Sequence, residues 1–160
     1  MIESKILVVS DSHGDVENMR RAVELVRPDM MIHLGDGWRD AELLAKSCPE
    51  LVIEKVPGNC DYRSGEALER MVTIENKTVM ICHGHTQGVK SDLGMILRTA
   101  QERGADAVLF GHTHKSFVDI RCGIVMLNPG SIGAWLRPTY GTLTIGDGKM
   151  VPAVFPLSRG

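Results

Sequence analysis

Short runs of aliphatic and β-branched residues alternate with helical patterns over the first two thirds of the chain. The runs predict strands at Lys5–Ser10, Met30–Leu34, Leu51–Val56, Met71–Ile74, Lys77–Cys82 and Ala107–Phe110. Apolar residues at helical spacing predict helices over Val16–Val26, Arg39–Lys46 and Leu93–Arg103. Such alternation is typical of βα units around a parallel sheet, so the pattern predicts an α/β fold.

The pattern changes after His114, where short strands are separated by turn signals. Strands are expected at Phe117–Ile120, Ile124–Leu127, Thr142–Ile145 and Met150–Val154. Gly146-Asp147-Gly148 predicts a tight hairpin, and a second hairpin is expected around Glu75-Asn76. We therefore expect an antiparallel C-terminal part. Because no linker or repeat separates it from the βα part, residues 1–160 are expected to form a single domain.

Composition and charge exclude several classes of protein. The chain has 160 residues, 43% hydrophobic and 24% charged, which is typical of a globular protein. No apolar run approaches the ~20 residues of a membrane span, and the apolar run at residues 6–9 is too short for a secretory signal. A formal net charge of −2 without a Lys/Arg run argues against a long nucleic acid as partner. We expect a small-molecule substrate and no membrane association.

The four cysteines are widely spaced and form no CxxC pair. They are interpreted as buried or incidental thiols of a reducing compartment, which predicts a cytoplasmic protein. The sequence leaves open whether the protein is a monomer or a small homo-oligomer.

The informative polar residues follow five predicted strands. The strands run into Asp11-Ser12-His13-Gly14, Gly35-Asp36-Gly37, Gly58-Asn59-Cys60-Asp61, His83-Gly84-His85 and Gly111-His112-Thr113-His114. Ligands of open α/β sheets bind outside the carboxyl ends of the strands, so these turns are expected to converge on one spot. Residues two apart on an extended turn point the same way, so both members of each Asp-x-His or His-x-His pair are expected to face one centre.

Imidazole and carboxylate ligands together suit Mn, Fe, Zn, Ni or Co, and the absence of paired thiolates argues against a structural zinc site. Seven candidate ligands are too many for one ion and fit two ions about 3.5–4 Å apart that share a carboxylate. Two divalent ions and two carboxylates leave a surplus of about two positive charges, which suits a phosphate. Because water on such ions can be deprotonated near neutral pH, the expected chemistry is hydrolysis at phosphorus.

The motif series, in this order along essentially the whole chain, closely resembles the calcineurin-like metallophosphoesterases. The short length and the Asn128-Pro129-Gly130-Ser131 segment resemble its small bacterial and archaeal phosphodiesterase branch. The resemblance implies a four-layer α/β-β/α sandwich of two mixed sheets flanked by helices. It also implies a dinuclear metal-dependent phosphodiesterase, in which a metal-activated hydroxide attacks a phosphate diester.

The resemblance further implies a ligand set. One ion would be held by Asp11, His13, Asp36 and His114, and the other by Asp36, Asn59, His83 and His112, with Asp36 bridging. Members of the family commonly use Mn, so Mn is the expected ion, with Fe, Zn and Ni as alternatives.

One position departs from the family pattern. Many relatives carry His after the Gly-Asn pair, where it assists the transition state or the leaving group, and this chain has Cys60. At pH 7 a thiol with a pKa of ~8.5 is less suited than a histidine to assist the leaving group. The assisting group is therefore left open between Cys60, His85 and water, and Asn59 is expected to take part in catalysis beside it. We expect a preference for diesters with good leaving groups.

Other roles stay open for several of these residues. Asp11 and Asp36 could cap following helices, Asn59 could serve a turn, and His85 could support the site, contact substrate or be a plain turn residue. His33 is interpreted as a satisfied core histidine, and the Asn128–Ser131 segment as a structural turn, while Lys115 and Arg137 could contact phosphate or be solvated charges. Substrate specificity is expected in loops around Asp15, Trp38, Tyr62–Ser64 and Gly88–Asp92.

Two other functions are considered. Some relatives of this fold resemble the retromer subunit, an interaction scaffold without effective catalysis, but scaffold versions tend to lose His ligands and none is missing here. A phosphomonoesterase differs only in substrate, and the short chain lacks the long insertions that would frame a protein substrate.

Overall fold

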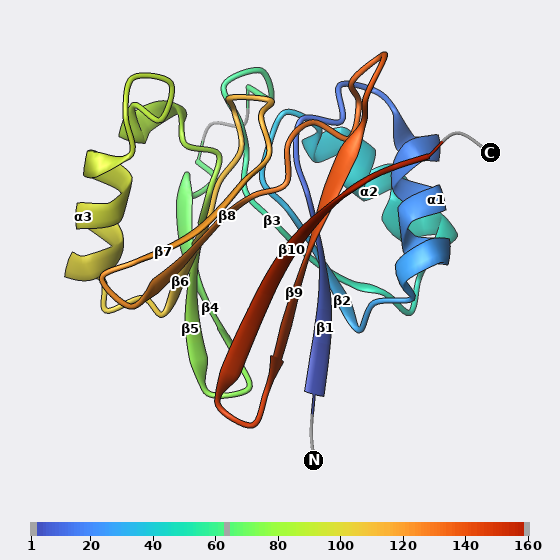
Figure 1. The fold of residues 1–160 in the computed structure, drawn as a ribbon. Helices are drawn as coiled ribbons and strands as arrows, with labels where there is room; N and C mark the ends of the chain where they lie inside the picture. Colours follow the sequence, from blue (N-terminus) through green and yellow to red (C-terminus); the bar gives the residue numbers. More distant parts are fainter. Residues whose placement is uncertain (1–2, 63–64, 159–160) are drawn as a thin grey trace.

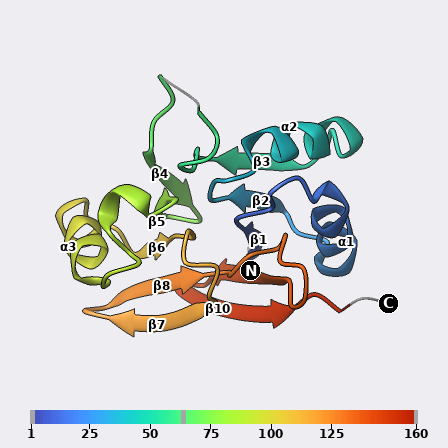
Figure 2. The ribbon, with the colours of Figure 1, turned by 90° about the horizontal axis from the view of Figure 1, so that it is seen from above.

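Two five-stranded sheets pack face to face and carry helices on their outer faces (Figures 1 and 2). This architecture is seen in a computed structural model, which describes residues 3–62 and 65–158. Of the predicted specificity loop Tyr62–Ser64, residues 63 and 64 lie outside the described part. The layers follow the order helix, sheet, sheet, helix, which confirms the predicted four-layer sandwich.

The first sheet has the strand order β10-β9-β1-β2-β3, formed by Lys149–Pro156, Thr139–Gly146, Glu3–Val9, Met30–His33 and Val52–Lys55. The second has the order β4-β5-β6-β8-β7, formed by Glu69–Ile74, Lys77–Cys82, Ala107–Leu109, Ile124–Asn128 and Phe117–Arg121. The first sheet is covered by α1 (Val16–Val26) and α2 (Trp38–Ser47), and the second by α3 (Gly94–Glu102) (Figure 2). A short 3₁₀ helix, η1, spans His85–Gln87. No helix in the described ranges is long and apolar enough to cross a bilayer.

Both sheets are mixed. β1 pairs in parallel with β2 and antiparallel with β9, while β6 pairs in parallel with both β5 and β8. The expected antiparallel pairing is seen within the C-terminal part, between β7 and β8 and between β9 and β10, whereas β8 also pairs in parallel with β6. The C-terminal strands are also divided, because β7 and β8 extend the second sheet and β9 and β10 the first. A short apolar run predicts a strand without indicating its partner, since pairing depends on contacts far along the chain.

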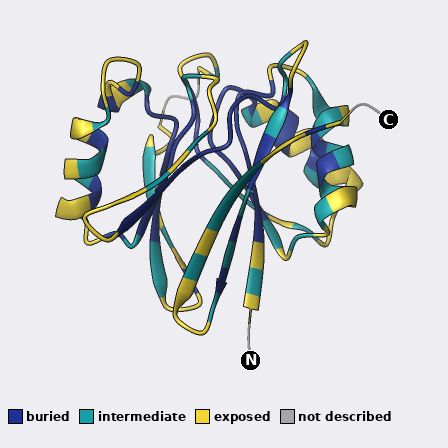
Figure 3. Cartoon of the chain, in the orientation of Figure 1, coloured by how far each residue is buried: buried dark blue, intermediate teal, exposed yellow. Residues whose placement is uncertain are grey.

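The core explains why the N-terminal strand is an unbroken apolar run. Ile6 and Val8 of β1 pack against residues of the second sheet, including Leu109, while Leu7 and Val9 pack toward α1. These four residues, which form the second half of β1, are fully buried (Figure 3). A strand covered on both faces has no reason to alternate polar and apolar side chains.

Three tight hairpins shape the sheet ends. Each has a two-residue loop in which both residues have positive φ: Glu75-Asn76, Cys122-Gly123 and Asp147-Gly148. Positive φ at both positions defines the type I′ turn, whose twist matches that of the paired strands. The two hairpins predicted from the sequence are confirmed.

Candidate metal centre

Three buried side chains form the floor of the site. Asp11 follows β1, Asp36 follows β2 and His83 follows β5, and their exposed fractions are 0%, 5% and 0%. His83 Nε2 lies 3.4 Å from Asp36 Oδ2 and 3.8 Å from Asp11 Oδ1. The ring is oriented by Nδ1–H, which donates to the Leu34 carbonyl at 2.8 Å and thereby directs Nε2 toward both carboxylates.

Three further imidazoles surround this floor. His13 Nε2 and His114 Nε2 lie 3.4 Å apart, at 3.7 Å and 3.2 Å from Asp11 Oδ1. His112 Nδ1 lies 3.2 Å from His83 Nε2. The structure thus brings together six of the seven predicted ligands from four loops, and the convergence expected at the strand ends is seen.

The environment of Asp11 shows that this arrangement fits a cation. Its Oδ2 accepts hydrogen bonds from Ser10 Oγ at 2.6 Å and from the His112 N–H at 3.1 Å. Its Oδ1 is buried and has no hydrogen-bond partner within the described residues. An unpaired buried carboxylate oxygen is costly, and imidazole nitrogens face this one from several sides. Mixed carboxylate and imidazole donors suit a borderline divalent metal, so the residues present fit such ions.

Charge in the floor is balanced by His83. Burial disfavours the Asp36 carboxylate, but the hydrogen bonds from His83 and from the Cys60 N–H outweigh it and hold the Asp36 pKa below its usual range. Burial likewise opposes a charge on His83, yet the pairing with Asp36 and the nearby Asp11 raise its pKa. The floor therefore favours positive charge between the two carboxylates.

The backbone at the ligands is left-handed. Positive φ angles between 43° and 70° occur at Asp11, His13, Asp36, His112 and His114. The expectation that the Asp-x-His and His-x-His pairs lie on extended turns is therefore wrong. Each loop reverses direction directly after its strand, and Asp and His tolerate the left-handed region better than most other residues do.

Asp61 organises the loop that carries Asp36. Its carboxylate accepts four backbone hydrogen bonds, from the N–H groups of Asp36 (2.8 Å), Gly37 (2.9 Å), Trp38 (3.0 Å) and Gly58 (2.7 Å). Two of these N–H groups lie at the start of α2, so Asp61 caps this helix and the proposed capping by Asp36 is wrong. The sequence pattern did not predict this role of Asp61, although its place beside Asn59 and Cys60 was a signal.

Gly58 shows why glycine is needed beside the ligand. A Cβ at this position would lie 2.2 Å from Asp36 Oδ1, which is closer than any contact allows. The loop after β3 can therefore approach the carboxylate only with glycine there.

A buried polar chain lies beneath the same loops. Ser12 Oγ donates to Asp40 Oδ2 at 2.6 Å, and His33 Nε2 lies 2.9 Å from Ser12 Oγ. His33 Nδ1 accepts from the Gly35 N–H at 3.1 Å, so the neutral Nε2–H tautomer satisfies both ring nitrogens. Burial lowers the pKa of His33 to about 4, consistent with a neutral ring. The interpretation of His33 as a satisfied core histidine is thus supported. The hydrogen-bonded series of polar side chains joins the loops after β1 and β2.

The Asn128–Ser131 segment supports the site from the second sheet. Asn128 Nδ2 donates to the Gly111 carbonyl at 3.2 Å and to Thr113 Oγ1 at 3.0 Å. Ser131 Oγ donates to the Asp11 carbonyl at 2.8 Å. The turn predicted from the sequence therefore holds two of the ligand loops in place.

The remaining predicted residues lie at the edge of the site. Asn59 and Cys60 are exposed on the loop after β3, where the Cys60 N–H donates to Asp36 Oδ1 at 2.8 Å and Asn59 Nδ2 donates to Cys60 Sγ at 3.5 Å. The His85 ring lies with its centroid 5.4 Å from that of His83 and 6.2 Å from that of His112. Helix α1 is capped by Asp15, which accepts from the Asn18 N–H, so the suggested capping role of Asp11 is wrong as well.

Comparison with known proteins agrees with this geometry. Residues 5–148 match the calcineurin-like phosphoesterase superfamily domain. The probable metallophosphoesterase YsnB of Bacillus subtilis is 34% identical over 129 residues, covering 79% of this chain and 74% of that protein. The phosphodiesterase YfcE of Escherichia coli is 28% identical over 153 residues, covering 80% of this chain and 79% of that protein.

Solved structures show the same architecture. A predicted phosphoesterase of Streptococcus pneumoniae superposes with a TM-score of 0.81 at 26% identity, covering 98% of this chain and 91% of that one. Vacuolar Protein Sorting 29 of Cryptosporidium parvum superposes with a TM-score of 0.75 at 18% identity, covering 99% and 100%, a likeness of fold alone. With the family match over most of its length, the chain is a phosphoesterase that belongs to the calcineurin-like phosphoesterase superfamily.

Proposed function

We propose that this protein is a phosphodiesterase that acts with two divalent ions held at the convergence of its loops. One ion would be held by Asp11, His13, Asp36 and His114, and the other by Asp36, Asn59, His83 and His112. The observation that carries the proposal is the buried, unpartnered Asp11 Oδ1, which faces imidazole nitrogens at 3.2–3.8 Å.

The position of Asp36 supports a pair of ions. Its Oδ2 lies 3.4 Å from His83 Nε2 and 3.9 Å from His13 Nε2. Asp36 therefore stands between an imidazole assigned to each ion, as a bridging carboxylate must. Two divalent ions bound here would supply an activated water as nucleophile and positive charge for the phosphoryl oxygens.

The proposed metal centre is open to solvent on one side. The side chains of His13 and His114 are 39% and 51% exposed, so a phosphate can reach the centre from their side. Burial and Asp36 raise the Cys60 pKa, while burial and His83 lower the His85 pKa. Neither group is a strong acid donor near pH 7, which supports the preference for diesters with good leaving groups.

Relatives support the substrate class, since YfcE, with 28% identity, is named a phosphodiesterase. We propose Mn²⁺ as the ion, because the family commonly uses it, and the cytoplasm as the compartment. All four cysteines are free thiols, which fits a reducing environment.

The decisive experiment combines metal analysis with hydrolysis of bis(p-nitrophenyl) phosphate. We expect two equivalents of metal per chain, turnover stimulated by Mn²⁺ and abolished by EDTA, and kcat/KM higher than for p-nitrophenyl phosphate. Lys149→Ala, which changes an exposed residue in the β9–β10 hairpin, is the control variant, and its metal content and turnover should equal those of the wild type. Turnover that survives EDTA would contradict the proposal, and a higher kcat/KM for the monoester would make the protein a phosphomonoesterase.

A further inference from the structure

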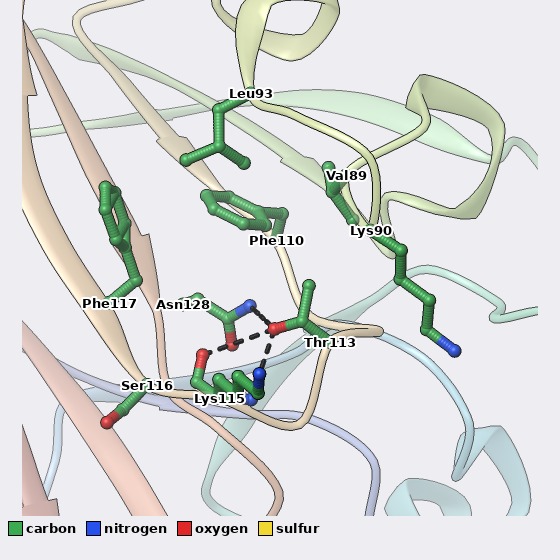
Figure 4. A pocket seen from close by; sticks show the side chains of 9 residues that line it. All are labelled: Val89, Lys90, Leu93, Phe110, Thr113, Lys115, Ser116, Phe117 and Asn128. Carbon is green, nitrogen blue, oxygen red and sulfur yellow. Dashed lines mark hydrogen bonds between the residues drawn. The ribbon is translucent and has the colours of Figure 1, made fainter.

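A pocket of about 560 Å³ lies beside the metal centre, between the loop that precedes α3 and the loop that joins β6 to β7 (Figure 4). This volume is within the range of ~300–1,000 Å³ found for small-molecule sites. Other hollows of this surface are as large, so its position and lining, and not its volume, support the inference.

The pocket shares a wall with the metal centre. Thr113 lines it and lies between His112 and His114 in the chain, so its Cα is about 3.8 Å from that of each ligand. Its side chain is fixed, because Thr113 Oγ1 accepts from Asn128 Nδ2 at 3.0 Å and from the Lys115 N–H at 3.1 Å (Figure 4). A phosphorus atom at the metal centre and a group in this pocket can therefore belong to one molecule.

The floor of the pocket is apolar and partly aromatic. Val89, Leu93, Phe110 and Phe117 line it, but Val89 and Phe110 are buried in the core, so the half-buried Leu93 and Phe117 form the surface that a ligand can contact. In Figure 4 these side chains group on one side of Thr113, with the phenyl ring of Phe110 between Leu93 and Thr113. Such a surface favours a flat apolar group, which gains from contact with aromatic rings.

Two lysines add positive charge to the same pocket. Lys90 and Lys115 line it, and within the described residues neither amine lies within ion-pair distance of a carboxylate. On a chain of net charge −2, two unpaired lysines beside an apolar floor are suited to an anionic group.

We propose that this pocket binds one ester arm of the substrate, and that the arm combines a planar aromatic group with a further anionic group, as a phosphorylated nucleoside does. The aromatic group rests on Phe117 and Leu93, and the anionic group meets Lys90 and Lys115. This inference rests on the proposed function, since it places the phosphorus at the metal centre. It also assigns a role to part of the Gly88–Asp92 loop, where specificity was expected from the sequence.

Three substrates with the same p-nitrophenolate leaving group test the proposal. Their second arm is methyl, thymidine through its 5′ oxygen, or the same thymidine carrying a 3′-phosphate. We expect kcat/KM to rise roughly tenfold from methyl to thymidine, as expected for a base on an aromatic surface, and severalfold more with the 3′-phosphate. Because the leaving group is constant, the ratios report the arm alone.

Two variants locate the effect. Ser116→Trp places a ring in the pocket from an exposed position and should bring the thymidine-to-methyl ratio close to one, whereas Ser158→Trp, at another exposed serine, should preserve the ratio. Lys90→Ala should remove the gain from the 3′-phosphate, and Lys149→Ala should keep it. Equal kcat/KM for all three esters in the wild type, or an unchanged ratio in Ser116→Trp, would overturn the proposal.

Binding separates this inference from the proposed function. If the metal-loaded protein hydrolyses none of the esters, the proposed function fails, and calorimetry with thymidine 3′,5′-bisphosphate then tests the pocket alone. Binding that is lost in Ser116→Trp but kept in Ser158→Trp would support the pocket. The absence of binding to the wild type would overturn it.

Discussion

The floor and the rim of the metal centre differ in almost every physical respect. On the floor, Asp11 and His83 are fully buried, whereas on the rim the side chains of His13 and His114 are 39% and 51% exposed. Burial makes an unpaired carboxylate expensive, and exposure lets a ligand arrive and leave. On the proposed function, the floor would determine whether ions are held, while the rim would determine what reaches them.

The two regions are also supported differently. Floor residues are fixed by hydrogen bonds to distant parts of the chain: His83 Nδ1–H donates to the Leu34 carbonyl, and the Asp36 N–H donates to the Asp61 carboxylate. At the rim, the backbone N–H groups of His13 and Cys60 also donate to Asp36, but the Asn59 side chain donates to its neighbour Cys60, at 3.5 Å. We therefore expect substitutions on the floor to have larger effects than those on the rim.

The largest effect is expected for Asp36→Asn. It removes the negative charge shared by both ions, so kcat/KM for bis(p-nitrophenyl) phosphate should fall roughly a thousandfold or more, about 4 kcal/mol of transition-state stabilisation. Metal analysis should show loss of bound metal, and circular dichroism should show a retained fold. Asp119→Asn, on exposed strand β7, is the control. Near-wild-type turnover in Asp36→Asn would contradict the bridging role.

An intermediate effect is expected for Asp61→Asn, because Asp61 contacts the backbone N–H of Asp36 and not its proposed metal-binding carboxylate. The variant replaces one of two oxygens that accept four N–H groups, so the Asp36 loop should loosen. Metal affinity should fall roughly 10–100-fold, as for other groups that orient ligands. Titration with Mn²⁺ measures the affinity, and saturating metal should restore most of kcat. A loss of kcat that excess metal does not restore would assign Asp61 a direct part in the reaction.

The smallest effect is expected for Cys60→Ala on the rim. The Cys60 pKa is raised by burial and by Asp36, so the thiol stays neutral near pH 7, and its contact with Asp36 is made by the backbone N–H. Alanine keeps that N–H, so kcat/KM for bis(p-nitrophenyl) phosphate should change by less than about threefold, under 1 kcal/mol. Cys122→Ala, at an exposed cysteine in the β7–β8 turn, is the matched control. A tenfold loss confined to Cys60→Ala would give the thiol a direct role.

Much of the fold was predictable because its helices and hairpins depend on local sequence patterns. The helix Val16–Val26 has the predicted bounds, and the hairpin at Asp147-Gly148 follows from residues that tolerate positive φ. Bounds were less accurate at β9, which begins at Thr139 rather than Thr142, because pairing with β1 and β10 extends the strand beyond its apolar residues. Local patterns do not contain that pairing.

The candidate site was predictable to the same extent. The residue types and their places at strand ends indicated a shared centre, and Asp11, Asp36 and His83 meet as expected. The left-handed backbone at these loops was not predicted, because it results from how each loop leaves its strand. Three of the four hydrogen bonds to Asp61 were not predicted either, since they join segments more than twenty residues apart.

By itself, the sequence determined which segments form strands and helices, and which side chains have the chemistry to hold divalent ions. Those properties depend on neighbours a few residues away and on the functional groups themselves. Only the tertiary structure decided that β8 pairs with β6, that Asp61 holds the Asp36 loop, and that a pocket lined by two lysines lies beside His112 and His114. Each of these is a contact between distant segments, whose free energy exists only after the two sheets have packed together.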